Sequence, residues 1–382
     1  MERRAAVRRV AYVSGTRADF GLMRRTLALA QASGEIDVSV LATGMHLSRT
    51  YGCTVEDIEA SGLRIAARVP ARLEEGTGAE MARAIGHEIV GFTDAVAAED
   101  PDAVLVLGDR GEMLAGAVAA MHLMKPVIHV HGGERSGTID EPVRHAISKL
   151  AHYHFVATAG ARERLVKMGE RAANVFVTGA PGLDGIAESA TSGRAELCAK
   201  NGFDPAKPIA LVVFHPVVQE ADDAGAQVRD VVEAALGRGL QCLALMPNSD
   251  AGSPAVRAVL DSYRGRDDVR LEMHLVREAY ASWMAAADVM VGNSSSGIIE
   301  AASLGLPVVN VGSRQSGRER SGNVIDVPAE RVAIAGGLAE ALKRGRRDYV
   351  NVYGDGHASE RIVKLLATLP LDVSLLAKTN AY

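Results

Sequence analysis

Short apolar segments rich in β-branched residues alternate with longer segments of helical periodicity along almost the whole chain. The segments VAYVSGT (10–16), DAVLVLGD (102–109) and PIALVVFHP (208–216) are apolar on both faces. A strand of this kind fits a parallel sheet that helices cover on both sides. The first strand is followed by a helical pattern from about 20 to 32. We therefore predict an α/β protein with doubly wound parallel sheets.

The chain is too long for one ordinary hydrophobic core, because it has 382 residues. Proline and glycine in TGAPGLDGI (178–186) follow a predicted strand and indicate a break. We predict two doubly wound Rossmann-like domains, 1–180 and 181–355, which face each other across a cleft. A last segment, 356–382, contains a helical pattern that could pack against either domain. Ligands of such sheets bind outside the carboxyl ends of the strands.

The composition excludes several classes of partner. The formal net charge is -5 and only 4% of the residues are aromatic, whereas nucleic-acid-binding faces need clustered cations and stacking rings. No apolar run has the length of a membrane-spanning helix, and the run after MERRAAVRR is too short for a signal peptide. Cys53, Cys198 and Cys242 are far apart and fit reduced thiols. We predict a cytoplasmic protein that binds neither nucleic acid nor membrane.

Polar residues cluster directly after the predicted strands. These residues are Arg17, Asp19, Asp109, Arg110, His129, His131, Glu134, Asp140, His145, His215, Asn248, Asp250, Ser294, Ser295, Ser296, Arg314 and Arg318. Each of them taken singly is better explained as a helix cap or a loop salt bridge. Their shared placement at strand exits favours one common site instead.

The segment GNSSSGIIEA (292–301) predicts a helix that starts at serines. A helix N-terminus has unpaired N–H groups and a partial positive charge, so it binds anions. A simple N-cap needs only one serine, and Arg314 and Arg318 follow downstream, so we interpret Ser294–Ser296 as an anion site. A buried Glu300 would be costly without donors, which the two hydroxyls of a ribose would supply. A phosphate and a ribose together indicate a nucleotide. The alternative is that Glu300 is a surface residue on the outer face of its helix.

The HVH segment places His129 and His131 two residues apart on a predicted strand, so both rings should point to the same side. A zinc pair is one interpretation, and one core histidine beside one pocket histidine is the other. No further ligands occur at metal-binding spacing, so we predict no metal. The GxGxxG and P-loop patterns are absent after the first strand, which argues against those nucleotide sites.

Asp109, Glu134 and Asp140 bring several carboxylates to the predicted cleft. Paired acids suit the removal of a proton from carbon or oxygen and its return. For Asp140 the N-cap of the helix that begins near Pro142 is an equally good interpretation.

Seven segments together carry a family resemblance. They are GTRADFGLM, TGMHLS, GDR, HGGERSGTIDEPVRHAISKLAHYHF, FHPV, GNSSSGIIEA and GSRQSGR, in this order, between about 10 and 326. The sequence resembles the hydrolysing UDP-N-acetylglucosamine 2-epimerases of the sialic-acid pathway type. The resemblance implies a fold like that of GT-B glycosyltransferases, with the last helix crossing back to the first domain. It also implies a reaction without metal or cofactor, in which UDP-N-acetylglucosamine and water give N-acetylmannosamine and UDP through elimination to a glycal and rehydration.

The resemblance assigns roles to residues of this sequence. Asp109 and Asp140 match the catalytic acids of the family. The nucleotide-sugar contacts match Arg17, Arg110, His215, Asn248, Ser294, Ser295, Glu300 and Arg314, with Arg318 as a weaker match. His131 stands where many family members have a catalytic glutamate, and Glu134 follows three residues later. Either side chain could take the place of that glutamate, because a histidine also transfers protons near neutral pH.

Three hypotheses about function follow. The first is the hydrolysing epimerase, acting on UDP-N-acetylglucosamine or on a UDP-2,4-diacetamido trideoxyhexose of the legionaminic-acid pathway. The second is a glycosyltransferase with the same architecture, and the third is a nucleotide-sugar sensor without catalysis. The family resemblance also implies a homo-oligomer, dimer or tetramer. The apolar segment GEMLAGAVAAMHLM (111–124) could supply the interface or could be a helix that covers the sheet.

Overall fold

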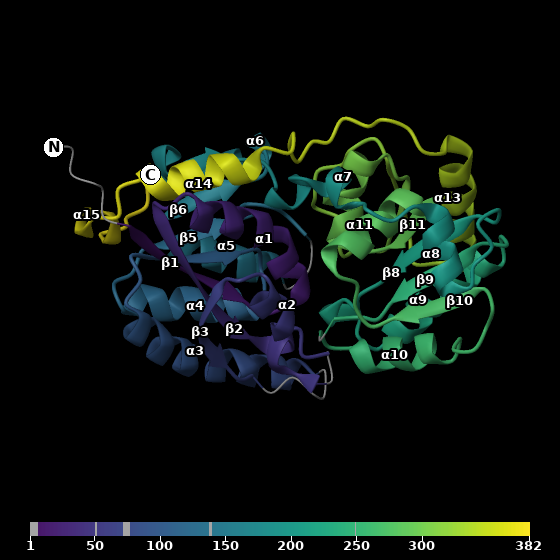
Figure 1. Ribbon diagram of the computed structural model, residues 1–382, viewed down its shortest axis with the longest axis horizontal. Coiled ribbons are helices and arrows are strands. Elements are labelled where there is room, and N and C mark those ends of the chain that lie inside the picture. The colour runs from purple at the N-terminus through teal and green to yellow at the C-terminus, as the bar shows by residue number, and fades with distance from the viewer. Residues whose placement is uncertain (1–6, 50–51, 72–76, 137–139, 249) are drawn as a thin grey trace.

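The computed structural model describes residues 7–49, 52–71, 77–136, 140–248 and 250–382. Two α/β domains lie side by side, each built around its own parallel sheet (Figure 1). This arrangement confirms the predicted fold class, since the alternating apolar segments form strands and the segments between them form covering helices.

The first sheet has the strand order β3-β2-β1-β4-β5-β6-β7 within the described residues, and all its pairs are parallel. Its strands are β1 (Arg8–Ser14), β2 (Ile36–Thr43), β3 (Arg64–Val69), β4 (Ala103–Leu107), β5 (Val127–Val130), β6 (Tyr153–Val156) and β7 (Val175–Val177). Its helices are α1 (Arg17–Ala32), α2 (Val55–Ala60), α3 (Gly78–Glu99), α4 (Gly111–His122), α5 (Asp140–Leu150) and α6 (Ala159–Lys167). One core lies between the sheet and α1, and another lies between the sheet and α3, α4 and α5.

The second sheet has the order β10-β9-β8-β11-β12-β13 and is also parallel throughout the part of the chain that is described. Its strands are β8 (Ile209–Val213), β9 (Gln241–Leu245), β10 (Val269–Glu272), β11 (Val289–Gly292), β12 (Val308–Val311) and β13 (Val324–Val327). Its helices are α7 (Ile186–Ser189), α8 (Arg194–Asn201), α9 (Ala224–Leu236), α10 (Ser253–Asp261), α11 (Arg277–Ala286), α12 (Ser295–Ile299) and α13 (Arg331–Arg344). Helices α9, α10 and α13 cover one face, and α8 and α11 cover the other.

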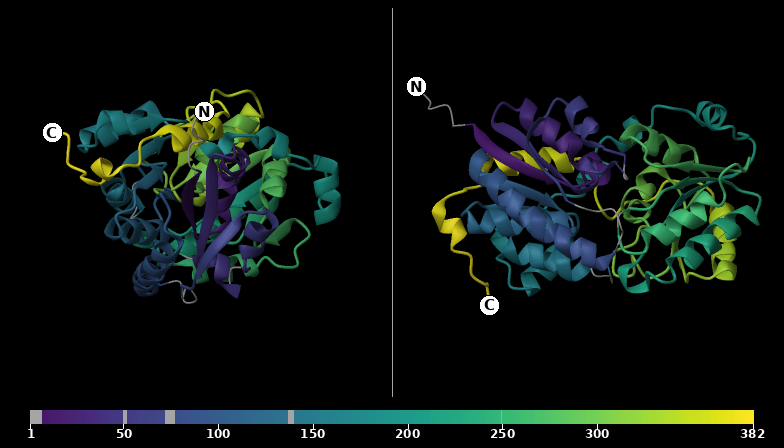
Figure 2. Two further views of the ribbon diagram at one scale, coloured as in Figure 1. Left: turned by 60° about the vertical axis from the view of Figure 1, so that its left-hand side comes forward. Right: turned by 90° about the horizontal axis from the view of Figure 1, so that it is seen from below.

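The connection between the sheets contains the short 3-10 helix η4 (Pro181–Leu183). After α13 the chain returns, and α14 (Ala358–Thr368) packs on α1 of the first domain (Figures 1 and 2). Ile362 and Leu366 of α14 join the core that contains Phe20. A short final helix, α15 (Val373–Leu376), follows. The last helical segment therefore belongs to the packing of the first domain.

The structure answers two questions that the sequence left open, where the first helix begins and what the 111–124 segment does. Helix α1 begins at Arg17 rather than near 20, because Thr16 and Asp19 form a capping box at its start. Helix α4 buries most of its residues against α3 and the sheet, so the 111–124 segment is a sheet-covering helix. Among the described residues, no helix combines the length and the apolarity that a bilayer crossing requires.

Candidate active site

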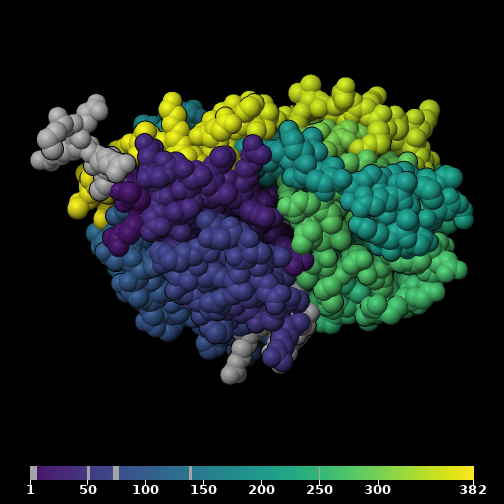
Figure 3. All heavy atoms as spheres, viewed as in Figure 1, coloured from purple at the N-terminus to yellow at the C-terminus, as the bar shows by residue number. Residues whose placement is uncertain are grey.

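A cavity of about 570 Å³ lies between the two domains, at the carboxyl ends of both sets of strands. Figure 3 shows the two domains meeting along this boundary, the first domain in purple and blue and the second in green. His129, His145 and Asp250 of the strand-exit cluster do not line this cavity. The residues to which the sequence assigns a catalytic or binding role all line it. They are Arg17, Asp109, Arg110, His131, Glu134, Asp140, His215, Asn248, Ser294, Ser295, Ser296, Glu300, Arg314 and Arg318.

The HGG segment after β5 places His131 in the cleft and His129 in the core. His131 has φ = 61°, in the left-handed region, so the chain leaves the regular alternation of the strand. His129 is fully buried, with Nε2 2.7 Å from the carbonyl oxygen of Gly108 and Nδ1 3.0 Å from Ser148 Oγ. The prediction that both rings point to one side is therefore wrong. One core histidine and one pocket histidine is the arrangement present.

Gly133 is required for this turn. Its φ is 73°, and a Cβ there would lie 2.5 Å from the carbonyl oxygen of Ala161. In the part of the chain that the structure describes, His, Cys, Asp and Glu side chains do not gather into groups of three that could hold a metal. The zinc-pair interpretation of the HVH segment therefore has no ligand set here.

His131 and Glu134 form a buried pair that reaches the other domain. His131 Nδ1 lies 2.5 Å from Glu134 Oε1, and their side chains are 8% and 4% exposed. Glu134 Oε2 forms an ion pair with Arg318 of the second domain. Burial, reinforced by Arg318, lowers the pKa of His131 to about 3, so the ring is neutral near pH 7. Because Glu134 is an acceptor at Nδ1, the lone pair of the neutral ring is on Nε2.

Asp109 is joined to this pair through Arg144, which the sequence analysis did not identify. Arg144 forms an ion pair with Asp109 and donates from Nη1 to the carbonyl oxygen of Glu134 at 3.1 Å. Its side chain is 1% exposed. Arg144 follows Asp140 by four residues on α5, so both side chains share the face that lines the cleft. That spacing was the available signal.

Asp140 is the first described residue of α5, and the residue before it lies outside the described residues. The N-cap interpretation therefore stays untested. Asp140 does affect its surroundings: burial alone would lower the pKa of Arg110, but Glu112, Asp250 and Asp140 together raise it. Arg110 thus remains a fixed positive charge beside Asp140.

Arg110 also connects the two domains. Its Nε lies 3.3 Å from Glu112 Oε1 in the first domain, and its Nη1 lies 3.3 Å from Asp250 Oδ1 in the second. Asn248 donates from Nδ2 to Asp250 Oδ2 at 2.5 Å. Arg17, at the start of α1, forms an ion pair with Asp57 in the same domain. Both arginines therefore have protein partners while they line the cleft.

Hydrogen bonds hold His215 so that its Nε2–H is a donor toward the cleft. Its Nδ1 accepts from the backbone N–H of Asn248 at 3.2 Å, so its proton is on Nε2. The Asn293 side chain fixes the backbone of His215 through bonds of 2.7 and 2.8 Å. Burial, reinforced by Arg314, lowers the pKa of His215 to about 3. The ring is therefore a neutral N–H donor near pH 7.

The serine segment forms the start of α12. Ser294 is the N-cap and accepts from Ser296 N at 3.4 Å, which confirms the N-cap role. Tyr280 OH lies 2.5 Å from Ser296 Oγ, and Arg314 donates to the carbonyl oxygen of Asn293 at 3.3 Å. Hydroxyls, N–H groups and a guanidinium thus meet at one place. Anion binding there stays a prediction.

Gly292 lets β11 approach β8 closely enough for this arrangement. Its φ is 138°, and a Cβ there would lie 2.1 Å from the carbonyl oxygen of Val213. Glu300, at the end of α12, is 3% exposed and forms an ion pair with Arg277. The interpretation of Glu300 as a residue of the outer helix face is therefore wrong. Arg277 is a second cleft residue that the sequence analysis did not identify, and its local sequence carries no signal for it.

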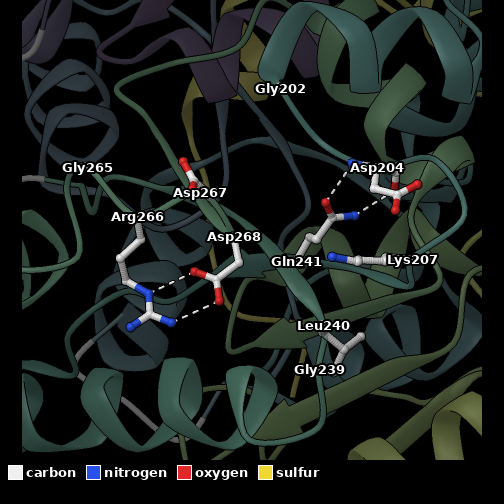
Figure 4. Close-up of a pocket in the computed structure, with 10 residues that line it drawn as sticks. All are labelled: Gly202, Asp204, Lys207, Gly239, Leu240, Gln241, Gly265, Arg266, Asp267 and Asp268. Atoms are coloured by element: carbon white, nitrogen blue, oxygen red, sulfur yellow. Dashed lines mark hydrogen bonds and ion pairs between the residues drawn. The ribbon is translucent and has the colours of Figure 1, made fainter.

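A separate shallow hollow lies at the amino ends of the second sheet (Figure 4). Two contacts within it involve polar side chains: Arg266 pairs with Asp268, and the amide of Gln241 bonds to the backbone of Asp204. The residues to which the sequence assigns a catalytic or binding role line the cleft and not this hollow.

Comparisons with known proteins identify the family of this chain. The model of the UDP-N-acetylglucosamine 2-epimerase family matches residues 28–367. A protein of Legionella pneumophila named UDP-N,N'-diacetylbacillosamine 2-epimerase (hydrolyzing) is 53% identical over 376 residues, 98% of this chain and 100% of that protein. A UDP-N-acetylglucosamine 2-epimerase of Neisseria meningitidis is 31% identical over 368 residues, 94% of this chain and 95% of that protein.

A solved structure has the same fold. The crystal structure of UDP-GlcNAc 2-epimerase from Neisseria meningitidis bound to UDP-GlcNAc superimposes with a TM-score of 0.79 at 20% identity, covering 94% of this chain and 99% of that one. The match of the family model over most of the chain, together with these relatives, shows that the protein belongs to the UDP-N-acetylglucosamine 2-epimerase family.

Proposed function

We propose that this protein is a hydrolysing 2-epimerase of a UDP-linked 2-acetamido sugar, with UDP-N,N'-diacetylbacillosamine as its preferred substrate. The observation that carries the proposal is the composition of one cleft, in which proton-transfer groups come from the first domain and anion and hydroxyl ligands come from the second. The name of the 53% identical Legionella protein supports the choice of sugar.

The second domain provides the nucleotide half of the cleft. The start of α12, Arg314 and the Nε2–H of His215 are donors for the pyrophosphate, whose negative charge grows as UDP leaves. Glu300 is an acceptor for the ribose hydroxyls. His215 follows β8, Arg314 follows β12 and Glu300 ends α12, so all of these groups reach the nucleotide from the second domain.

The first domain provides the proton-transfer half. Elimination removes the C2 proton to a base and breaks the C1–O bond to UDP, which leaves a glycal with a C1–C2 double bond. Water then adds its oxygen to C1, and C2 takes a proton from the other face, so the sum is UDP-sugar and water to the free 2-epimer and UDP. Two proton-transfer groups are needed. We assign Nε2 of His131, oriented by Glu134, to one face, and the carboxylates of Asp109 and Asp140 to the other.

Product analysis tests the proposal. The protein is incubated with UDP-N,N'-diacetylbacillosamine in deuterated water, UDP is measured, and the sugar is examined by NMR. We expect UDP release, the free 2-epimer and one deuterium at C2. Asp109→Asn should slow UDP release and C2 exchange together by about 100-fold or more. A protein that transfers sugar to an acceptor without C2 exchange would be a glycosyltransferase, and one that binds without UDP release would be a sensor; either outcome contradicts the proposal.

UDP-N-acetylglucosamine is the second candidate substrate, because the 31% identical Neisseria protein is named for it. The two substrates differ at C4 and C6 of the sugar, so a comparison of kcat/KM for both decides between them. A higher kcat/KM for UDP-N-acetylglucosamine would show that this sugar nucleotide is the preferred substrate. The proposed reaction would stay the same.

We also propose a homo-oligomer in the cytoplasm, with UDP-sugar as the ligand and without cofactor or metal. Light scattering of the purified protein measures the oligomeric state. A mass equal to that of one chain contradicts the proposed homo-oligomer. Turnover that survives exhaustive treatment with a chelator supports a metal-independent reaction.

A further inference from the structure

We propose that Arg277 is a positioning residue that holds Glu300 ready for the ribose and links it to the connection between the domains. The inference rests on the proposed function in one respect, because it takes the ligand of Glu300 to be the ribose of a nucleotide. Arg277 itself lies at the cleft wall as the first residue of α11.

Arg277 makes two contacts with one guanidinium. Nη1 forms an ion pair with Glu300 Oε1, and Nη2 donates to the carbonyl oxygen of Gly182. The Arg277 side chain is 14% exposed and that of Glu300 is 4% exposed, so water screens the pair weakly. A planar guanidinium with fixed donors can hold both partners at once, which the single ammonium of a lysine does less well.

Glu300 needs this partner because it is buried. A carboxylate removed from water is costly unless a counter-charge and donors surround it. Arg277 engages Oε1 and so compensates the charge of Glu300, and Oε2 is the oxygen that it does not engage. With Oε1 fixed, Oε2 has a defined direction from which it can accept the ribose hydroxyls. Arg277 thus acts on the ligand through Glu300.

The second contact lies at the connection between the domains. Gly182 belongs to η4, which packs against α1 of the first domain; a Cβ on Gly182 would lie 2.3 Å from Leu22 Cδ2 and 3.4 Å from Glu300 Oε1. The next residue of α11, Glu278, pairs with Arg24 of α1 at 3.1 Å. The start of α11 therefore contacts both the nucleotide half and the first domain.

The experiment measures UDP affinity by calorimetry in the wild type, Arg277→Gln and Arg277→Lys, with dideoxy-UDP, which lacks both ribose hydroxyls, as the second ligand. We expect Arg277→Gln to weaken UDP by at least about tenfold, the size of one hydrogen bond to a charged group. Dideoxy-UDP should bind the variant and the wild type almost equally. Arg277→Lys should restore part of the UDP affinity, because it keeps the counter-charge.

Arg346→Gln is the matched control. Arg346 holds the other end of α11, with Nη1 3.0 Å from the carbonyl oxygen of Met284 and 2.7 Å from that of Ala287, and it does not line the cleft. Its loss should lower stability without a change in the ratio of UDP to dideoxy-UDP affinity. In a double-mutant cycle, Arg277→Gln should add little to the loss of UDP affinity caused by Glu300→Gln.

The outcomes separate this inference from the proposed function. An equal loss of UDP and dideoxy-UDP affinity in Arg277→Gln, or additive losses in the cycle, overturns the positioning role and leaves the epimerase proposal intact. A wild-type protein that binds neither UDP nor its analogue overturns both.

Discussion

Most charged side chains of the cleft are paired with a partner from a distant part of the chain. Asp109 pairs with Arg144, Glu134 with Arg318, and Glu300 with Arg277. Buried ion pairs contribute little net stability, because desolvation offsets the attraction, but each fixes the direction of its groups. These ion pairs therefore fix the geometry of the site. They leave His131 as the neutral group of the first domain that is best placed to transfer a proton.

Replacing His131 or Glu134 separates the base from the group that orients it. We expect His131→Gln to abolish measurable UDP release, and Glu134→Gln to lower kcat by about 10- to 100-fold with little change in KM. Because burial lowers the pKa of His131, the ring stays neutral well below pH 6.5, and kcat/KM should not fall with an apparent pKa near the ordinary value of about 6.5. A wild-type kcat/KM that falls on acidification with an apparent pKa of about 6.5 would contradict this assignment.

At the scale of elements, α14 depends on a cap from another segment. Asp184, between η4 and α7, accepts from the backbone N–H of Ala358 and of Ser359 at 3.0 and 2.5 Å. Thr26 and Ser359 bond at 2.8 Å, and Arg8 donates to the carbonyl oxygen of Leu366 at 2.8 Å. A helix N-terminus with unpaired N–H groups gains from such an acceptor. The connection between the domains therefore also anchors the returning helix.

Asp184→Ala tests this anchor. We expect the free energy of unfolding to fall by about 1–2 kcal/mol, the usual effect of losing a helix cap. Asp372→Ala is the control, since Asp372 caps the short helix α15, which buries none of its residues. Its effect should stay within about 0.5 kcal/mol. Equal denaturation midpoints for Asp184→Ala and the wild type would show that α14 does not need the cap.

At the scale of the whole molecule, two separately packed sheets meet at a cleft that is rich in titratable groups. Burial lowers the pKa of His129, His131 and His215 to about 3, and burial helps to lower that of His152 to about 4. Burial acts in the opposite sense on carboxyls: it raises the pKa of Glu88 to about 9. Folding therefore changes proton binding at several places at once, and the stability depends on pH.

Stability should fall as the pH is lowered from about 7 to about 5. Below the unfolded pKa of about 6.5, the unfolded chain binds protons at these histidines that the folded protein does not, and each proton contributes about 1.4 kcal/mol per pH unit. Glu88 and Asp19 have raised pKa values and oppose this trend, but the histidines outnumber them. Urea denaturation at about pH 7 and about pH 5 measures the change, and a midpoint that rises on acidification would contradict it.

The sequence by itself determined the fold class and the membership of the cleft. Apolar segments on both faces of a strand require a parallel sheet between helices, and all parallel strands direct their carboxyl ends to one edge. Polar residues after strands of the same sheet, such as His215 and Ser294, therefore had to meet at one edge. The local pattern also identified the serine cap of α12, because a cap depends on neighbours along the chain. It predicted the helical segment that forms α14 but not the domain on which α14 packs.

Only the tertiary structure decided which charges are partners. Arg144 reaches Asp109, Arg318 reaches Glu134 and Arg277 reaches Glu300 because of how helices dock on the sheets and how the two sheets face each other. Spacing along the sequence holds no record of these contacts. The same holds for His129 and His131, which strand periodicity places on one side. The left-handed backbone at His131 sends one ring to the core and the other to the cleft.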